Sequence, residues 1–167
     1  MSSKHNAGGR GSAHDDMHKD ALNETGFWGR QAAGCLILAN TTRRLCIARR
    51  GPKALEPLTW GTWGGAVDPH EAPEDAVRRE IVEEAGYRSE VELTPLLVFN
   101  HHSGFQYHNF LATVPDEFTP QLDWETCDWV WCAFNEWPRP LHPGLITLLA
   151  DAASLQAIRR AIDDCAL

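Results

Sequence analysis

The sequence has few basic residues and lacks long apolar runs. It contains 15 Lys and Arg residues against 23 Asp and Glu residues, which gives a formal net charge of −8 at pH 7. Sequence-independent binding of DNA or RNA needs clustered Lys and Arg, so this composition argues against that function. The longest apolar runs, such as residues 35–39, are far too short to span a bilayer, and no apolar segment follows the first N-terminal charges. We therefore expect a cytoplasmic protein that binds neither nucleic acids nor membranes.

Cysteine pairs are also missing. The chain has five cysteines, an odd number, and none of them forms a C-x-x-C motif. All lie within or beside apolar segments, where a free cysteine behaves as a small buried apolar residue. We expect reduced, buried thiols at Cys35, Cys46, Cys127, Cys132 and Cys165.

The first 26 residues lack aromatic residues, Val and Ile, so they cannot bury enough apolar surface to offset the entropy of ordering. We interpret residues 1–26 as a flexible lead. Its three histidines, at irregular spacing, fit no metal-ligand pattern. Residues 27–167 have the length and apolar content of a single domain with one core.

Short apolar runs separated by turn residues fill the rest of the chain. Pro73 and Gly86 are typical first and terminating residues of a helix, and residues 40–43 have the composition of a hairpin turn. We expect a helix at Pro73–Ala85, one or two helices within 141–166, and strands at 31–39, 44–49, 60–67, 91–100, 105–114 and 126–134. The order β-β-β-α-β-β-β-α predicts an α/β/α sandwich, a mixed β-sheet with helices packed on both faces.

Three carboxylates share one side of the predicted helix. At 100° per residue, Glu80, Glu83 and Glu84 fall within an arc of about 100°. Like charges this close repel one another, and a hard divalent cation that prefers oxygen ligands relieves the repulsion. Mg²⁺ is the natural candidate, and Mn²⁺ is an acceptable substitute. Taken alone, the pattern fits a solvated helix face better than a metal site.

Two glycines precede this helix. Gly64 and Gly65 allow the backbone to come close to the N-terminal region of the helix, where carbonyls and amides can meet a metal ion and phosphate. A metal held by carboxylates and shared with substrate phosphates is suited to phosphate ester or anhydride chemistry.

The segment from Gly65 to Tyr87 resembles the Nudix box, G-x5-E-x7-R-E-U-x-E-E-x-G-U, in which U is a bulky apolar residue. The match is complete and covers 23 residues at Gly65, Glu71, Arg79, Glu80, Ile81, Glu83, Glu84, Gly86 and Tyr87. The resemblance implies a Nudix α/β/α sandwich. It also implies a Mg²⁺-dependent pyrophosphohydrolase that cleaves a phosphoanhydride bond in a nucleoside diphosphate linked to another moiety: a nucleotide, nucleotide-sugar or dinucleotide type of substrate.

The resemblance also implies roles for the box residues. Glu80, Glu83 and Glu84, together with the backbone carbonyl of Gly64, would be the metal ligands. Glu71 and Arg79 would pair and brace the loop against the helix. Such outer partners fix the orientation of metal ligands.

The general base is open at this point. Some Nudix enzymes use the glutamate after the box arginine, here Glu80, and others use a carboxylate from a later loop. The segment 122–129 resembles that later loop. It offers Glu125, which we prefer, and Asp128; an ordinary surface role for both is an equal alternative.

Substrate contacts are the least determined part of the site. Arg49 and Arg50, with Lys53, form a basic cluster that is suited to phosphate. Trp63, where many family members have proline, is a candidate for stacking on a base. The aromatic residues Trp28, Trp60, Phe105 and Tyr107 also fit that role, although a place in the core is more common for such residues. A nucleotide-sensing domain without catalysis is the alternative function, and a homodimer is left open.

Overall fold

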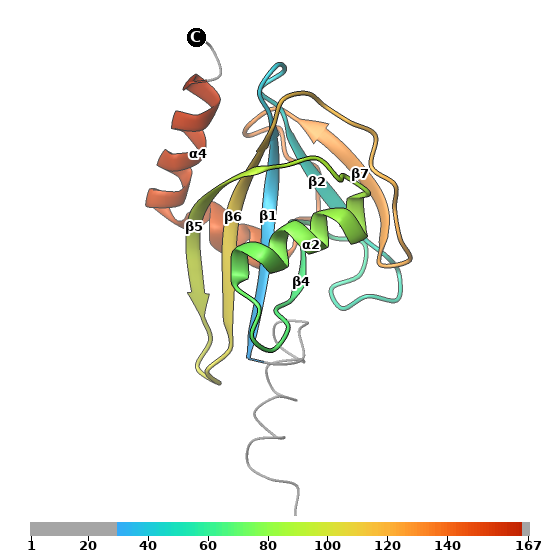
Figure 1. Cartoon of the computed structure of the whole chain (residues 1–167), viewed down its shortest axis with the longest axis vertical. Helices are drawn as coiled ribbons and strands as arrows, with labels where there is room; N and C mark the ends of the chain where they lie inside the picture. The colour runs from blue at the N-terminus through green and yellow to red at the C-terminus, as the bar shows by residue number, and fades with distance from the viewer. Residues whose placement is uncertain (1–29, 165–167) are drawn as a thin grey trace, which may run out of the picture.

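The computed structural model describes residues 30–164, so the predicted lead at residues 1–26 and Trp28 lie outside the described part. No helix within this range is long and apolar enough to cross a membrane. Figure 1 shows strands and helices wound into one sandwich. The elements are β1 (Gln31–Ala39), β2 (Leu45–Arg50), β3 (Trp60–Gly61), β4 (Trp63–Ala66), α2 (Pro73–Ala85), β5 (Glu92–Asn100), β6 (Gln106–Val114), β7 (Thr126–Cys132), α3 (Pro143–Ala150) and α4 (Ala152–Asp164).

β1 is the central strand of the sheet. It pairs parallel with β6 and antiparallel with β2 and β4. The main path of the sheet is β3-β2-β1-β6-β5, and β7 pairs with β2 outside this path. The predicted mixed sheet is therefore confirmed, and so is the predicted hairpin, because Leu38 of β1 lies opposite Leu45 of β2.

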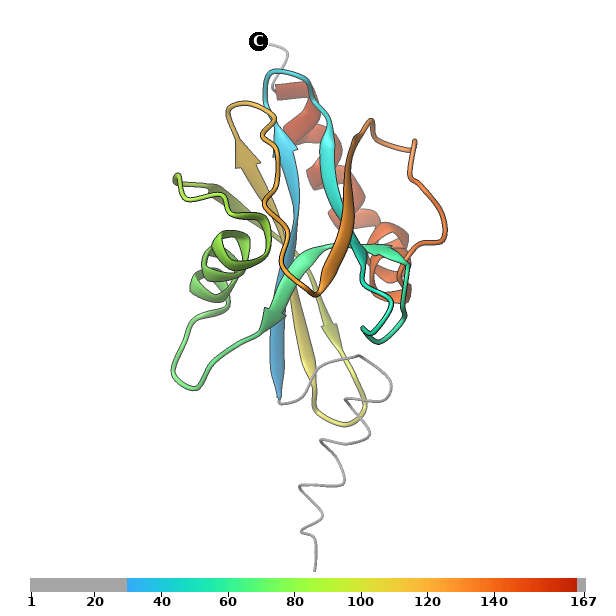
Figure 2. The same cartoon turned by 90° about the vertical axis from the view of Figure 1, so that its right-hand side faces the viewer.

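The two faces of the sheet carry separate apolar clusters. Cys35 and Ile37 of β1 pack in the cluster that contains the buried face of α2, whereas Leu36 and Leu38 pack in the cluster that contains α3 and α4. Alternate residues of a strand point to opposite faces, so one nearly all-apolar strand serves both layers. Figure 2 shows α2 on one side of the strands, with α3 and α4 on the other. The α/β/α sandwich is confirmed.

Helix α2 begins and ends where the sequence predicts. Pro73 stands in its first turn, where a missing backbone N–H leaves no hydrogen bond unmade. Gly86 ends the helix in the left-handed conformation, with φ 69°, and its N–H donates to the carbonyl of Val82 at 3.1 Å.

The prediction of one or two helices within 141–166 is confirmed, because α3 and α4 lie there and are separated at Asp151. Two predictions need correction. The single strand expected at 60–67 is interrupted at Thr62: β3 pairs with β2, while β4 crosses to pair with β1. Among the described cysteines all are free, but Cys127 is exposed, in contrast to the three buried thiols.

Candidate active site

Helix α2 presents two buried carboxylates to β4. The side chains of Glu80 and Glu84 point inward, with relative exposures of only 9% and 7% for the two residues, whereas Glu83 is exposed. Val77 and Ile81 hold the same side of the helix in the core. Two acids in a mainly apolar surrounding are costly to bury unless a partner neutralises them.

Close approach of β4 to these carboxylates depends on two glycines. The N–H of Gly64 donates to Glu84 Oε2 at 2.8 Å. A Cβ at Gly65 would overlap the Glu80 carboxylate, and a Cβ at Gly64 would overlap the Ala33 carbonyl on β1. The glycines therefore face the middle and C-terminal half of α2. Our expectation that they approach the N-terminal region of the helix was wrong, because β4 runs beneath these later turns.

Arg79 connects the loop before α2 to the carboxylates. Its Nε and Nη2 each donate to Glu71 at 3.0 Å, a two-point contact, and Nη2 also donates to the Ala66 carbonyl at 2.8 Å. Its Nη1 donates to Glu80 at 2.7 Å and to Glu83 at 3.2 Å. One guanidinium thus fixes the loop, the end of β4 and two acidic side chains together.

Burial and like charge shift the acid–base equilibria of the site. Burial raises the pKa of Glu84 to about 8; the Gly64 N–H opposes this shift, and the charge of Glu80 adds to it. Burial also raises the pKa of Glu80, against the opposing hydrogen bond from Arg79. In contrast, the Arg79 hydrogen bond lowers the pKa of Glu71. When both acids of the buried pair are ionised, Arg79 and the Gly64 N–H compensate their repulsion only in part, and a bound cation would relieve it further.

The donor set fits a hard divalent cation in its chemistry. Carboxylate oxygens on α2 and the backbone of β4 are the ligand types that such ions prefer. Within residues 30–164, however, no three His, Cys, Asp or Glu side chains already converge as metal ligands. Arg79 draws Glu80 and Glu83 toward itself, so a cation would have to compete with the guanidinium for them.

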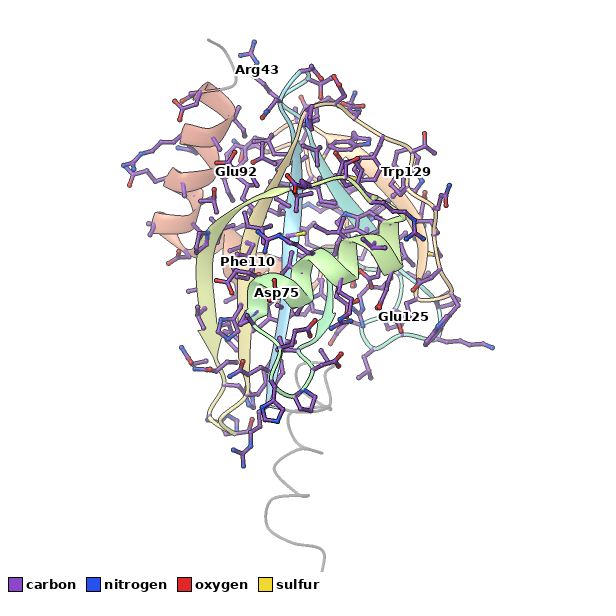
Figure 3. The ribbon with its side chains drawn as sticks, in the orientation of Figure 1. Arg43, Asp75, Glu92, Phe110, Glu125 and Trp129 are labelled. Carbon is purple, nitrogen blue, oxygen red and sulfur yellow. The ribbon has the colours of Figure 1, made fainter. Side chains whose placement is uncertain are left out.

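The loop before β7 adds further acids. The negative charge of Glu125 raises the pKa of both Glu80 and Glu84, and Figure 3 shows Glu125 below the C-terminal end of α2. Partial desolvation raises the pKa of Glu125 itself, and Asp123 adds to the shift. Sequence reasoning missed Asp123, although it lies in the segment 122–129, two residues before Glu125. Asp128 instead accepts a hydrogen bond from the N–H of Trp129 at 2.8 Å.

Of the three residues predicted to contact substrate, the structure supports Arg50 and contradicts Trp63. Arg50 lies at the site: its positive charge lowers the pKa of Glu125, and its Nε donates to the Leu55 carbonyl at 2.6 Å. Arg49 lies with its guanidinium 5.7 Å from the ring centre of Trp60. Trp63 needs correction as a substrate contact, because its ring is fully buried and its Nε1 donates to the Cys46 carbonyl at 3.2 Å. The bulk of Trp63 supports the core beneath the glycines.

A cavity of about 250 Å³ opens between the sheet and the N-terminus of α3. Its lining includes apolar residues, among them Leu97, Phe99 and Phe105, and polar residues, among them Thr62, Tyr107, Asn109 and His142. A concave, mainly apolar pocket with a few fixed polar groups is the usual form of a small-molecule site. Of these residues, Phe105 and Tyr107 were candidates from the sequence; the others were missed because they come from distant elements.

The polar groups of the cavity are held in place. Tyr107 and Thr62 share a hydrogen bond of 3.0 Å between their hydroxyl oxygens. His142 caps α3 by accepting the N–H of Gly144 at 3.0 Å, and burial lowers its pKa to about 4. The neutral imidazole is the form that can accept this bond.

The cavity and the acidic cluster are neighbours. The charge of Glu84 raises the pKa of Tyr107, and the charge of Arg50 lowers the pKa of His142, although burial is the main cause of both shifts. Thr62 lies between β3, at the cavity, and β4, at the carboxylates. The segment around Thr62 therefore connects the lining of the cavity to the strand that contacts the carboxylates.

Comparison with known proteins identifies the family. The NUDIX domain model matches residues 28–152, which is most of the chain. The chain belongs to the Nudix family. The predicted membership is confirmed, and the acidic turn of α2 with its glycine approach and its Arg79–Glu71 pair is the Nudix box of this protein.

Relatives and solved structures agree with this Nudix assignment. The chain is 34% identical over 146 residues to "Putative 8-oxo-dGTP diphosphatase 3" of Mycobacterium tuberculosis, covering 81% of this chain and 64% of that protein. It thus spans less than two thirds of the length of the curated relative. The crystal structure of RenU, a Nudix hydrolase from M. smegmatis, matches with a TM-score of 0.65 and 28% identity, covering 83% of this chain and 89% of that chain. A MutT Nudix hydrolase from Burkholderia pseudomallei matches with a TM-score of 0.55 and 27% identity, covering 80% and 95%.

Proposed function

We propose that the protein is a Mg²⁺-dependent pyrophosphohydrolase that cleaves a phosphoanhydride bond in a nucleoside diphosphate linked to another moiety. The observation that carries the proposal is the buried pair Glu80 and Glu84, closed in by Gly64 and Gly65. Burying two acids side by side on α2 is unfavourable for a purely structural purpose. It is favourable when a cation and phosphate oxygens share the site.

Glu80, Glu83, Glu84 and the carbonyl of Gly64 would hold the ion, with Mn²⁺ as an acceptable substitute. When bound, the ion offsets phosphate charge and lowers the pKa of coordinated water. The Arg79–Glu71 pair keeps the loop and the carboxylates in register, so its role is positioning. Arg50 supplies positive charge beside the acids and is suited to a phosphate oxygen.

Glu125 is our preferred general base. The negative charge of Glu125 acts on the box carboxylate Glu80. The pKa of Glu125 is also raised, and a carboxylate with a raised pKa accepts a proton more efficiently near neutral pH. Asp128 has a local backbone partner and exerts no such influence in the shifts described above. Glu80 remains the alternative base, with the constraint that Arg79 hydrogen-bonds the same carboxylate.

The nucleoside end of the substrate is assigned to the cavity. Phe99 and Phe105 offer apolar surface to a base, and Thr62, Asn109 and His142 offer polar contacts. The proposed partner is therefore a small nucleotide. We also propose that the protein acts in the cytoplasm. The name of the mycobacterial relative suggests 8-oxo-dGTP as one substrate to test.

The test is product release from a nucleotide panel of 8-oxo-dGTP, ADP-ribose, ADP-glucose and diadenosine tetraphosphate, with Mg²⁺ and with EDTA. We expect Mg²⁺-dependent cleavage of at least one substrate. Glu84→Gln and Glu80→Gln should each lower kcat at least about a hundredfold and leave thermal melting nearly unchanged, because each removes a charge but little volume. Nucleotide binding without turnover under all conditions would instead support the sensing alternative.

A further inference from the structure

Trp124 is the most exposed of the large apolar residues between residues 30 and 164. Its relative exposure is 77%, while the next, Ile146 on α3, reaches 54%. Scattered apolar residues are normal on a protein surface. The position of Trp124 is therefore the informative feature.

Trp124 stands between two acids of the active site. Asp123 and Glu125, its chain neighbours, both act electrostatically on Glu84. The backbone of this segment is also anchored, because the N–H of Gly51 donates to the Glu125 carbonyl at 2.7 Å. A Cβ at Gly51 would lie 3.3 Å from the Trp124 carbonyl. The indole is thus attached to a segment that packs against the loop between β2 and β3.

That loop separates Trp124 from the cavity. Its first residue, Gly51, contacts the Trp124 segment, and a later residue, Glu56, lines the cavity. Figure 2 shows the chain that leads into β7 descending between α2 and this loop. Arg50, the last residue of β2, acts electrostatically both on Glu125 and on His142 of the cavity. A positive charge therefore lies close enough to act on the Trp124 segment and on the cavity.

We propose that the substrate carries two planar bases: one enters the cavity, and the other stacks on Trp124. The inference rests on the proposed function, and it narrows the substrate class to dinucleoside polyphosphates. The polyphosphate chain would cross the acidic cluster beside Arg50, where charge complementarity favours it. A nucleoside triphosphate has one base only and leaves the indole in water. An indole offers its face to any base, so the site selects the presence of a second base and not its identity.

The test compares diadenosine tetraphosphate with ATP as substrates in the presence of Mg²⁺. For Trp124→Ala we expect a KM about tenfold higher for diadenosine tetraphosphate, with kcat within about threefold, since one stacking contact is lost. The KM for ATP should change less than about twofold. Trp124→Phe should restore most of the affinity, and Ile146→Ala, the matched exposed control on α3, should change neither KM. An equal rise for both substrates, or no rise for diadenosine tetraphosphate, would overturn the inference.

A binding experiment separates this inference from the proposed function. Calorimetric titration of each nucleotide into the wild type and into Trp124→Ala needs no turnover. If neither nucleotide is cleaved, the proposed activity fails for these substrates. The inference still predicts tighter binding of diadenosine tetraphosphate than of ATP, with the difference lost in Trp124→Ala. Equal dissociation constants for the two nucleotides in the wild type would refute it.

Discussion

Substitution of Gly65 by alanine should inactivate the enzyme without unfolding it. The new Cβ would overlap Glu80 Oε1 and lie 2.7 Å from the carboxylate carbon, where ordinary contacts are 3.4–4 Å. The obstructing group is the end of a flexible side chain, so the carboxylate can turn away while the backbone stays in place. A displacement of about 1 Å at a catalytic group can cost about a hundredfold in rate. We therefore expect kcat to fall at least that far.

Stability should respond differently at the two neighbouring glycines. Gly65→Ala reduces the freedom of the unfolded chain, which offsets part of the overlap, so the melting temperature should stay within a few degrees of the wild type. Gly64→Ala would overlap the Ala33 backbone, which is held by the pairing of β1 with β4. The free energy of unfolding of Gly64→Ala should therefore fall by about 1–3 kcal/mol.

The assay is steady-state turnover on the best panel substrate, with thermal melting of each variant. If Gly65→Ala acts through Glu80, adding it to Glu80→Gln should lower kcat by no more than about threefold further, because both changes affect one group. Near-normal turnover of Gly65→Ala would refute the claim that the position of Glu80 matters. Unfolding of Gly65→Ala would refute the argument that only a side chain must move.

The remaining predictions concern the base, the arginine and the cap of α3. Glu125→Gln should lower kcat by about two to four orders of magnitude with Mg²⁺ affinity unchanged, while Asp128→Asn has little effect; a loss below about tenfold would retire Glu125 as base. Arg79→Lys should lower kcat or metal affinity about 10- to 100-fold, because a lysine ammonium cannot make the two-point contact of the guanidinium with Glu71. Unchanged kinetics would contradict a positioning role for Arg79. The pKa of His142 is lowered to about 4, so between its unfolded value of about 6.5 and pH 4 the unfolded chain binds more protons, and stability falls as pH falls. Melting scans should show a shallower decline for His142→Asn, which keeps a cap without titrating; an identical decline would exclude His142 as a cause.

Local signals explain why the fold was largely predictable. Pro73 and Gly86 mark the ends of α2 by their own backbone preferences, and the structure follows both. The apolar run of β1 predicts a strand, and the observed strand is buried on both faces. The interruption at Thr62 was not predictable in this way, because it depends on which partner strand each half of the segment meets.

Within the site, the box acids could be placed on one side of a helix from periodicity alone. Their burial could not, since it depends on β4 packing over Glu80 and Glu84. Trp63 illustrates the limit: an aromatic residue beside a catalytic loop looks the same in sequence whether it faces substrate or core, and here it is in the core. The cavity combines residues of β5, β6 and α3, which are distant in sequence, so no local motif indicates it.

Direct titration with Mn²⁺, followed by electron paramagnetic resonance of the free ion, tests whether α2 and β4 form a metal site. The measurement needs no substrate and compares the wild type with Glu84→Gln and with Trp124→Ala, a control variant that keeps every carboxylate. We predict that the wild type and Trp124→Ala bind the ion with the same affinity, and that Glu84→Gln binds it at least tenfold more weakly, because one anionic ligand is lost. Equal affinity in the wild type and Glu84→Gln, with both folded, would contradict the assignment of the metal to these carboxylates.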